Sequence, residues 1–269
     1  MKCGTSWIQS CLESRSDVCL PRGVKETFYF DRHYRRRQLD WYAEHFRLAG
    51  PDQTILEIAP TYFHAAGIVD RVAEALGPIP IVITLRDPVA RAFSLYRHMR
   101  RYGMTRRATF GEALIHHPEI IESSRYATHL RRWQDRFGTS RVRVVWMETL
   151  RRDPFAFANQ VCSALDIARP TDPDALPGRI NEATIPRHHA VATAGRWAGD
   201  LLRRHRLYRP IEIAKSLGIK PLFFGTAEPS PIRQSPPSAT ESEIERFRNL
   251  LGNEWPQIES LKPPIDAAA

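Results

Sequence analysis

The pattern of hydrophobic and polar positions divides the first two thirds of the chain into short strands and longer helices. Short runs of β-branched and aromatic residues predict strands, at residues 27–30, 54–58, 79–86 and 142–146. The run at 79–86 is apolar on both faces, which is typical of a strand buried between two layers. Asp87 and Pro88 follow it, one as a helix cap and the other in the first turn, where a missing N–H costs nothing.

Between these runs, apolar residues recur every three or four positions and predict helices. Their expected ranges are 4–14, 37–46, 67–76, 88–102, 123–137 and 154–165. Because strands alternate with helices, we expect a mostly parallel sheet with helices on its faces, an α/β fold.

The composition changes after Ile167. Pro-rich loops lead to expected helices at 197–206 and 210–217, a Pro- and Ser-rich stretch at 229–237 and a final helix from about 240 to 251. We interpret residues 1–269 as a single domain, with an α/β body over about 1–168 and a helical, Pro-rich cap over about 169–269.

The amino-acid composition is typical of a globular protein. The 269 residues are 42% hydrophobic and 26% charged, enough for one substantial core. No apolar run approaches the roughly 18 to 20 residues of a membrane span, and the N-terminus lacks the apolar segment of a signal peptide. We therefore expect a cytoplasmic protein without a membrane partner. Its four cysteines show no zinc-site spacing, so we expect reduced thiols and no metal.

The net charge of +9 comes almost entirely from arginine, since only five of the 39 basic residues are lysine. Guanidinium groups bind phosphate and sulfate bidentately, so one interpretation is a surface that attracts anions. A genome that favours arginine codons explains the same bias. The arginine runs at 35–37 and 203–204 carry no aromatic interleaving or nucleic-acid motif, and we expect no nucleic-acid partner.

The first segment with candidate chemistry opens the chain. Lys2, Gly4, Thr5, Ser6 and Trp7 lie at the entry to the first helix, where unpaired backbone N–H groups and the helix dipole favour an anion. The segment lacks the full G-x-x-x-x-G-K-[ST] spacing of nucleoside-triphosphate loops. Taken alone, it is equally compatible with a capped helix near a flexible terminus.

The second segment runs from Arg86 to Tyr96. Arg86 ends a buried strand, and ligands of open parallel sheets bind outside the carboxyl ends of strands. Ser94 lies about two turns into the following helix, so an arginine and a hydroxyl could share one phosphate. The alternative is an Arg86 paired with a nearby carboxylate and a Ser94 on a neutral helix surface.

Together, in this order and about 80 residues apart, the two segments resemble the sulfotransferase family, in particular its carbohydrate (heparan-type) and related bacterial branch. The resemblance implies a P-loop-type parallel sheet and the co-substrate 3′-phosphoadenosine 5′-phosphosulfate. It implies that Lys2, Gly4, Thr5 and Ser6, with Trp7 beside them, hold the 5′-phosphosulfate in the K-x-G-T-[ST] motif. The R-D-P-x-x-R-x-x-S-x-Y motif implies that Arg86 and Ser94 hold the 3′-phosphate.

Further stretches extend the resemblance over about residues 2–167. Residues 25–31 resemble the family's K-E-x-x-[FY]-F segment, 59–63 its [ST]-P-x-Y-F segment, and 148–154 its E-x-L-x-x-D-P region. Residues 126–133 also match the Y-x-x-x-L-x-x-W pattern. Beyond them only residues 181–187 resemble the loop that closes over the nucleotide, which implies a contact from Arg187.

The resemblance also assigns catalytic roles. Sulfuryl transfer needs a base for the acceptor proton and positive charge at the oxygen that leaves with the 5′-phosphate. It places the base at Glu26 and the stabilising charge at Lys2, with Lys25 as a contact to donor or acceptor. For Glu26 the alternative is a solvated strand-edge charge, and His33 or His64 are candidate bases ranked below it.

Residues of the 59–63 segment and its neighbour complete the expected acceptor site. We list Lys25, Thr61, Tyr62 and His64 as expected acceptor contacts, although aromatic residues such as Tyr62, Phe63 and Trp7 are more often part of a core.

One departure from the family pattern concerns the sheet. In the family a buried strand runs directly into the phosphate loop, whereas here Met1 directly precedes Lys2. We therefore expect the first strand to be missing from this chain and Met1 to be an internal methionine of a longer natural one. A loop anchored on one side only would lose pre-organisation.

The sequence thus predicts a sulfotransferase that modifies a hydroxyl or amine of a carbohydrate or small metabolite. Two alternatives remain: a P-loop kinase-like phosphoryl transferase, for which we find no acidic magnesium ligand, and an inactive basic relative that binds glycans or nucleic acid. The acceptor could be a sugar, peptide, polyketide or lipid, and the oligomeric state is open.

Overall fold

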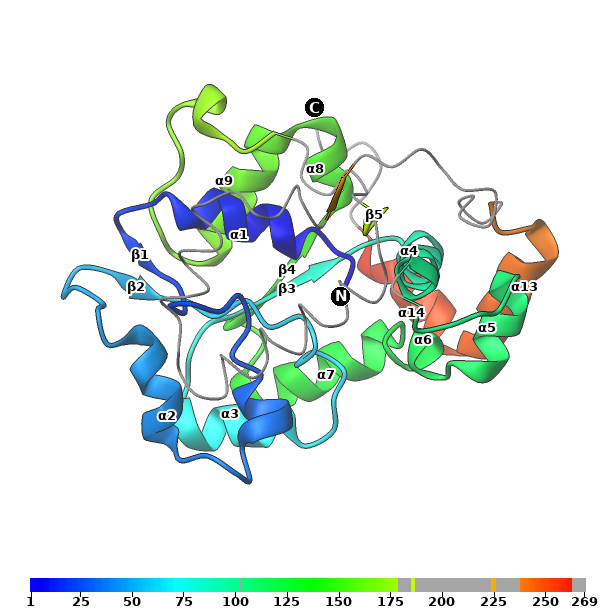
Figure 1. The fold of residues 1–269 in the computed structure, drawn as a ribbon, viewed down its shortest axis with the longest axis horizontal. Coiled ribbons are helices and arrows are strands. Elements are labelled where there is room, and N and C mark those ends of the chain that lie inside the picture. Colours follow the sequence, from blue (N-terminus) through cyan, green and yellow to red (C-terminus); the bar gives the residue numbers. More distant parts are fainter. Residues whose placement is uncertain (102, 179–184, 187–223, 226–237, 263–269) are drawn as a thin grey trace.

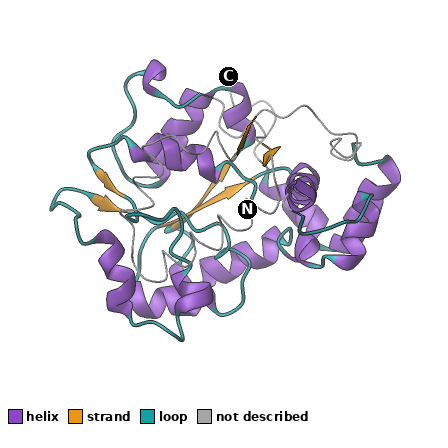
Figure 2. Ribbon diagram, viewed as in Figure 1, coloured by secondary structure: helices purple, strands orange, loops and turns teal. Residues whose placement is uncertain are grey.

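The computed structural model describes residues 1–101, 103–178, 185–186, 224–225 and 238–262. Two pairs of parallel strands form its centre (Figures 1 and 2). In the first pair β1 (Val18–Cys19) runs beside β2 (Thr54–Ile55), and in the second β3 (Ile81–Leu85) runs beside β4 (Val142–Trp146). The predicted parallel α/β architecture is confirmed. A further short pair, β5 (Ile185–Pro186) and β6 (Phe224–Gly225), is antiparallel.

Helices cover both faces of the β3–β4 pair. Successive side chains of these strands point to opposite faces, and each face packs into its own hydrophobic core. Ile83 and Leu85 face the larger core, with α3 (Ile68–Leu76), α4 (Pro88–Arg101) and α7 (Tyr126–Phe137). Val82 and Val145 face the other, with α1 (Thr5–Glu13) and α9 (Pro154–Ala164). Figure 1 shows α1 and α9 on one side of these strands and α3 and α7 on the other. Apolar burial on both faces explains why the strand sequence is hydrophobic without alternation.

The remaining helices complete the described chain. They are η1 (a π-helix, Tyr29–His33), α2 (Leu39–Ala43), η2 (Glu44–Phe46), α5 (Phe110–His116), α6 (Glu119–Glu122), α8 (Glu148–Arg152), η3 (Pro173–Ala175), α13 (Glu241–Leu251) and α14 (Glu254–Leu261). Of these, α13 packs against α5 and α6, and α14 packs against α7. Phe247 of α13 is fully buried in the larger core, with its ring 6.1 Å from that of Phe110.

Side-chain caps fix several helix starts that the sequence predicts. Asp87 Oδ1 accepts a hydrogen bond from Ala90 N at 2.8 Å, and Asp153 accepts one from Ala156 N at 2.9 Å. Thr240 forms a capping box with Glu243 at the start of α13. Each cap satisfies a backbone donor that the first turn leaves unpaired, so these local signals were readable in the sequence.

The strand predicted at residues 27–30 is wrong. Phe28 adopts a left-handed conformation, with φ 52°, and the chain continues into the π-helix η1. Backbone donors here bond to side chains instead of to a neighbouring strand: Tyr29 N donates to Thr27 Oγ1 at 3.1 Å. The aromatic run that suggested a strand buries Tyr29 and Phe30 together in one core, which consecutive residues of a strand could not do.

Several other predicted bounds need correction. The helix predicted at 37–46 is α2 followed by the 3-10 turn η2, and the one predicted at 123–137 begins only at Tyr126. The strand predicted at 54–58 is limited to Thr54–Ile55. β1, α5, α6, α8 and α14 were not predicted, and the helices predicted at 197–206 and 210–217 lie outside the described residues.

A cavity of about 690 Å³ separates the two strand pairs. Consecutive residues on both sides line it, 54–60 in β2 and the segment after it and 79–85 along β3, so the strands present their edges to it. In a parallel pair alternate amides point away from the partner. Because Ile81 N donates to Arg141 O, the N–H groups of Val82 and Thr84 point to the cavity. The strand expected to precede Lys2 stays a prediction.

Two searches were restricted to the described ranges. Within them, no helix has both the length and the apolar character that crossing a bilayer would require. Nor do the His, Cys, Asp and Glu side chains in this part of the chain form a group of three that could hold a metal ion.

Candidate functional site

The segment at the start of α1 is a tight loop. Gly4 has φ 81°, a left-handed conformation that favours glycine, and it precedes the first turn of the helix. A Cβ on Gly4 would lie 3.4 Å from Leu150 Cδ2 and 3.5 Å from Met147 Cγ, so the loop packs closely against the end of β4. The amides of Thr5 and Ser6 occupy the first helical turn, which has no intrahelical acceptors for them. This geometry can hold an anion.

Positive charge gathers around this loop. Lys2 has a pKa lowered first by burial and then by the neighbouring cations Arg101, Arg86 and Lys25. Like charges held together in a half-buried site repel one another, and an anion placed among them relieves that repulsion. The concentration of cations therefore favours a phosphate- or sulfate-bearing ligand at the loop.

Arg86 leaves the carboxyl end of β3 and reaches the loop. Its Nη1 donates to Lys2 O at 3.4 Å, whereas its buried Nε has no hydrogen-bond partner among the described residues. Burial lowers the pKa of Arg86, and the nearby Arg151 lowers it further. Tyr126 Oη fixes the backbone by donating to Arg86 O at 3.0 Å. A guanidinium with an unsatisfied buried donor is suited to bind an anion.

Ser94 lies in α4, on the same helix face as two residues that interact electrostatically with Lys2. His98 and Arg101 follow it by four and seven residues, so the three side chains share one face. The pKa of His98 is lowered to about 4, by burial first and then by Lys2 and Arg101, so this histidine is neutral at pH 7. Sequence reasoning did not select His98 or Arg101. Helical spacing from Ser94 was the signal that could have found them.

The Lys25–Glu26 segment meets the loop directly. Lys25 Nζ donates to Ser6 Oγ at 2.7 Å, which joins two motifs 19 residues apart in the sequence. Burial lowers the pKa of Lys25. Burial also raises the pKa of Glu26, although Lys25 opposes that shift. A carboxylate with a raised pKa beside an anion site is the kind of group that can act as a general base.

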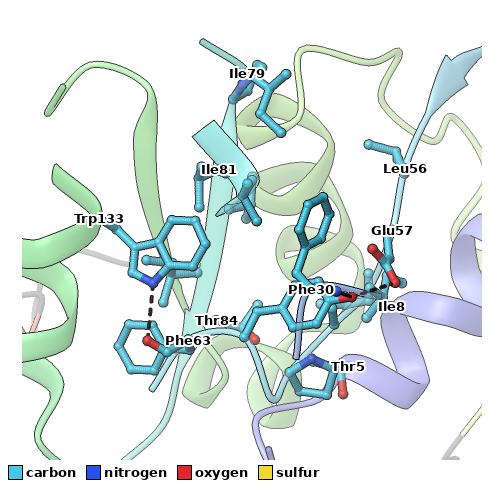
Figure 3. A pocket seen from close by; sticks show the side chains of 18 of the residues that line it. Thr5, Ile8, Phe30, Leu56, Glu57, Phe63, Ile79, Ile81, Thr84 and Trp133 are labelled. Atoms are coloured by element: carbon cyan, nitrogen blue, oxygen red, sulfur yellow. Dashed lines mark hydrogen bonds between the residues drawn. The ribbon is translucent and has the colours of Figure 1, made fainter. Parts of the chain in front are cut away.

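The expected acceptor contacts are more mixed. Tyr62 is buried, and its hydroxyl accepts from Phe30 N at 3.3 Å and donates to Glu57 Oε1 at 3.3 Å. Figure 3 shows Glu57 directed into the cavity beside Phe30, with this hydrogen bond dashed. Thr61 donates to Asp31 Oδ2 at 2.9 Å. The structure therefore places both residues in hydrogen bonds that hold the turn after Glu26.

The histidines differ in position. His64 lines the cavity together with Thr5, and burial lowers its pKa to about 4. His33, in the π-helix segment, packs against Trp41 with the two rings tilted and their centroids 5.1 Å apart. Only His64 thus shares the cavity with the loop.

Trp7 turns away from the loop at residues 2–6, called the anion loop below. Its Nε1 donates to Pro177 O at 2.9 Å, and its ring packs edge-on against Phe157 in the smaller core. The structure does not bring Trp7 together with the other expected donor contacts. Arg187 lies outside the described residues.

The site thus brings together Lys2, Gly4, Thr5, Ser6, Lys25, Glu26, Arg86 and Ser94. Segments that are far apart in sequence meet at the carboxyl end of β3 and the start of α1. Their chemistry combines a loop suited to hold an anion with the half-buried carboxylate of Glu26.

Comparison with known proteins identifies the family of this chain. The family model for the sulfotransferase domain matches residues 1–176. The bifunctional heparan sulfate N-deacetylase/N-sulfotransferase 1 of Xenopus tropicalis is 27% identical over 192 residues, which are 64% of this chain and 22% of that protein. The corresponding protein 3 of Homo sapiens is 26% identical over 162 residues, 55% of this chain and 19% of its own length.

A solved structure shows the same fold. The sulfotransferase from Alicyclobacillus acidocaldarius has a TM-score of 0.58 and 25% sequence identity, with 77% of this chain and 92% of that one covered. The chain spans only about a fifth of the length of the curated relatives it matches. Since the family model covers well over half of the sequence, this chain belongs to the sulfotransferase family.

Proposed function

We propose that this chain transfers the sulfuryl group of 3′-phosphoadenosine 5′-phosphosulfate to a hydroxyl or amine. The observation that carries the proposal is the hydrogen bond from Lys25 Nζ to Ser6 Oγ, which brings the carboxylate of Glu26 to the anion loop. Membership of the sulfotransferase family supports this chemistry. This contact holds the proposed base, Glu26, next to the loop proposed to bind the donor.

The residues fit such a donor. The close approach at Gly4 and the unpaired amides of the first turn suit the 5′-phosphosulfate, with Lys2 beside them. The Nε of Arg86, which has no partner in the described part of the chain, and the hydroxyl of Ser94 suit the 3′-phosphate. When bound, the nucleotide supplies the sulfuryl group and the leaving oxygen.

The chain's own side chains then divide the chemistry. Glu26 accepts the proton of the attacking hydroxyl or amine as the new bond to sulfur forms. Lys2 and the loop amides stabilise the negative charge on the oxygen that takes the electron pair of the broken bond. Lys25 and the loop orient the two reactants, which turns an encounter of two molecules into a local step.

We favour a carbohydrate or small-metabolite acceptor. Relatives named as heparan sulfate N-sulfotransferases support an amine or hydroxyl carried on a sugar. The residues that would contact the acceptor lie outside the two best-matched motifs, so the proposal does not extend to one compound.

The test is transfer of labelled sulfate from the donor to a panel of sugars, amino sugars and small hydroxylated metabolites, in EDTA. We expect turnover by the parent chain and at least a 100-fold loss in Glu26→Gln, because a positioned general base contributes about 10²- to 10⁴-fold. The matched control is Glu44→Gln, since Glu44 is an exposed carboxylate paired with Arg47. Full activity of Glu26→Gln would reject the base assignment. Transfer from ATP that requires magnesium would indicate a kinase instead.

A further inference from the structure

The turn that follows Glu26 has an unusual backbone. Phe28 adopts φ 52° and ψ 24°, a left-handed conformation that bulky residues rarely take. The π-helix η1 begins immediately after it. The guanidinium of Arg32 lies 4.0 Å from the centre of the Phe28 ring and covers it. Such a conformation persists only where surrounding groups hold it in place.

One carboxylate oxygen supplies much of that support. Glu57 Oε1 accepts from Thr27 N at 3.0 Å and from Thr27 Oγ1 at 2.5 Å. The same oxygen accepts from Tyr62 Oη at 3.3 Å. Thr27, which is itself buried, is the residue directly after Glu26.

The bonds continue from Glu57 into the turn. Thr27 Oγ1 accepts from Tyr29 N at 3.1 Å, and Tyr62 Oη accepts from Phe30 N at 3.3 Å. Three backbone donors of the turn, at Thr27, Tyr29 and Phe30, are therefore satisfied either by Glu57 or by hydroxyls bonded to Glu57. Without that carboxylate, Thr27 N and both hydroxyls would lose their common acceptor in a buried place.

We propose that Glu57 is a positioning residue for Glu26: it anchors the turn at Thr27 and thereby fixes the carboxylate of Glu26 beside the anion loop. This inference rests on the proposed function, in which Glu26 is the base. Glu57 comes from the segment after β2, so an element distant in sequence sets the geometry of the base. A base displaced by about 1 Å loses up to about 100-fold in rate.

Charge adds a second effect that an experiment can detect. Burial is the main cause of the raised pKa of Glu26, and the charged groups that act on it are Lys25, the ammonium of Met1, Glu57 and Arg32. Glu57 is the one among these four that raises the pKa of Glu26, because two carboxylates repel each other. Burial also raises the pKa of Glu57 itself, and the hydrogen bonds from Thr27 oppose that shift and favour its charged form.

Two substitutions separate position from charge. Glu57→Gln keeps a carbonyl oxygen that can accept from Thr27, but it removes the negative charge. Glu57→Ala removes both. Three quantities are measured for each variant. The first is the pKa of Glu26, from the ¹³C NMR signal of its carboxyl group, which is assigned by its absence in Glu26→Gln. The others are the affinity for adenosine 3′,5′-bisphosphate and the rate at which labelled sulfate is released from the donor to water.

We expect Glu57→Gln to lower the pKa of Glu26 and to keep most of the turnover. Glu57→Ala should lower turnover by about 10- to 100-fold, with adenosine 3′,5′-bisphosphate affinity unchanged, because the loop and Arg86 are untouched. The matched control is Glu254→Ala. Glu254 also accepts from a threonine and two amides, Ala127 N at 3.1 Å and Thr128 N at 3.3 Å, but touches no residue of the candidate site.

An unchanged pKa of Glu26 in Glu57→Gln, or parent-level turnover in Glu57→Ala, would overturn the inference. So would Glu254→Ala if it reproduced both effects at a similar loss of melting temperature, since that would show a general loss of stability. Failure of the proposed function has a different signature: Glu26→Gln remains fully active or adenosine 3′,5′-bisphosphate does not bind. The NMR titration tests Glu57 in either case.

Discussion

Replacing Arg86 by alanine should weaken binding of the 3′-phosphate and leave the rest of the nucleotide unaffected. The guanidinium is half-buried at the end of β3, and its Nε has no partner among the described residues. Hydrogen bonds between charged groups contribute about 1.5 to 3 kcal/mol each. At about 1.4 kcal/mol for each factor of ten, Arg86→Ala should raise the dissociation constant of adenosine 3′,5′-bisphosphate by about 10- to 150-fold.

The assay compares two nucleotides by isothermal titration calorimetry at one ionic strength. Adenosine 3′,5′-bisphosphate carries the 3′-phosphate and adenosine 5′-phosphate lacks it, so the difference between them isolates the contribution of Arg86. We expect the full loss for the first and less than a threefold loss for the second. Arg86→Lys should fall between, because an ammonium keeps the charge without the planar fork.

The matched control is Arg47→Ala, since Arg47 is an exposed arginine paired with Glu44. It should bind both nucleotides as the parent chain does. If Arg86→Ala weakened both nucleotides equally, Arg86 would support the loop through its bond to Lys2 O and would not bind the 3′-phosphate. That result would refute the reasoning.

Three further predictions concern the loop, the base and the cavity. Gly4→Ala should lower the melting temperature and weaken the binding of adenosine 3′,5′-bisphosphate. A φ of 81° costs a residue with a Cβ about 1–2 kcal/mol, and the new Cβ would lie 3.4 Å from Leu150 Cδ2. Calorimetry that showed parent-level stability would contradict this. Burial raises the pKa of Glu26 above its ordinary value of 4.5. Turnover should therefore fall as the pH drops through this raised pKa, because the base becomes protonated. The free energy of unfolding should fall as the pH rises through the same pKa, because the buried carboxyl becomes charged. Glu26→Gln should therefore melt higher at pH 7 and lose that gain under acid conditions; an equal melting temperature at pH 7 would speak against burial of the charge. An N-terminal extension of about five or six β-forming residues should raise the melting temperature by pairing with the edge of β3 that lines the cavity, whereas a proline-containing extension should not.

Local signals predicted the parts of the fold that neighbouring residues determine. The pattern at 79–86 identified β3 and the carboxyl end where Arg86 emerges, and Asp87 with Pro88 identified the start of α4. The short amphipathic helices α5 and α14 were not predicted, because each contains too few apolar positions to show a clear helical period. The strand predicted at residues 27–30 was wrong because aromatic residues are common both in strands and in the cores around other elements. Only the tertiary packing distinguishes these two cases.

The candidate site shows the same division. The loop motif and the Arg86–Ser94 spacing located the helix starts that carry the residues proposed to hold the donor, since both motifs are short and depend on one helix start each. Trp7, His98 and Glu57 could not be judged in this way, because each depends on which distant segment lies opposite. Trp7 belongs to a core, while His98 and Glu57 lie at the site.

The sequence by itself determined the alternation of strands and helices, the anion loop and the family, because each is written in residues close together along the chain. Only the tertiary structure decided that Lys25 contacts Ser6, that Glu57 supports the turn after Glu26, and that β2 and β3 face each other across a cavity. These contacts join segments 19 residues or more apart. Their geometry depends on how helices and strands pack around a common core, which no local pattern specifies.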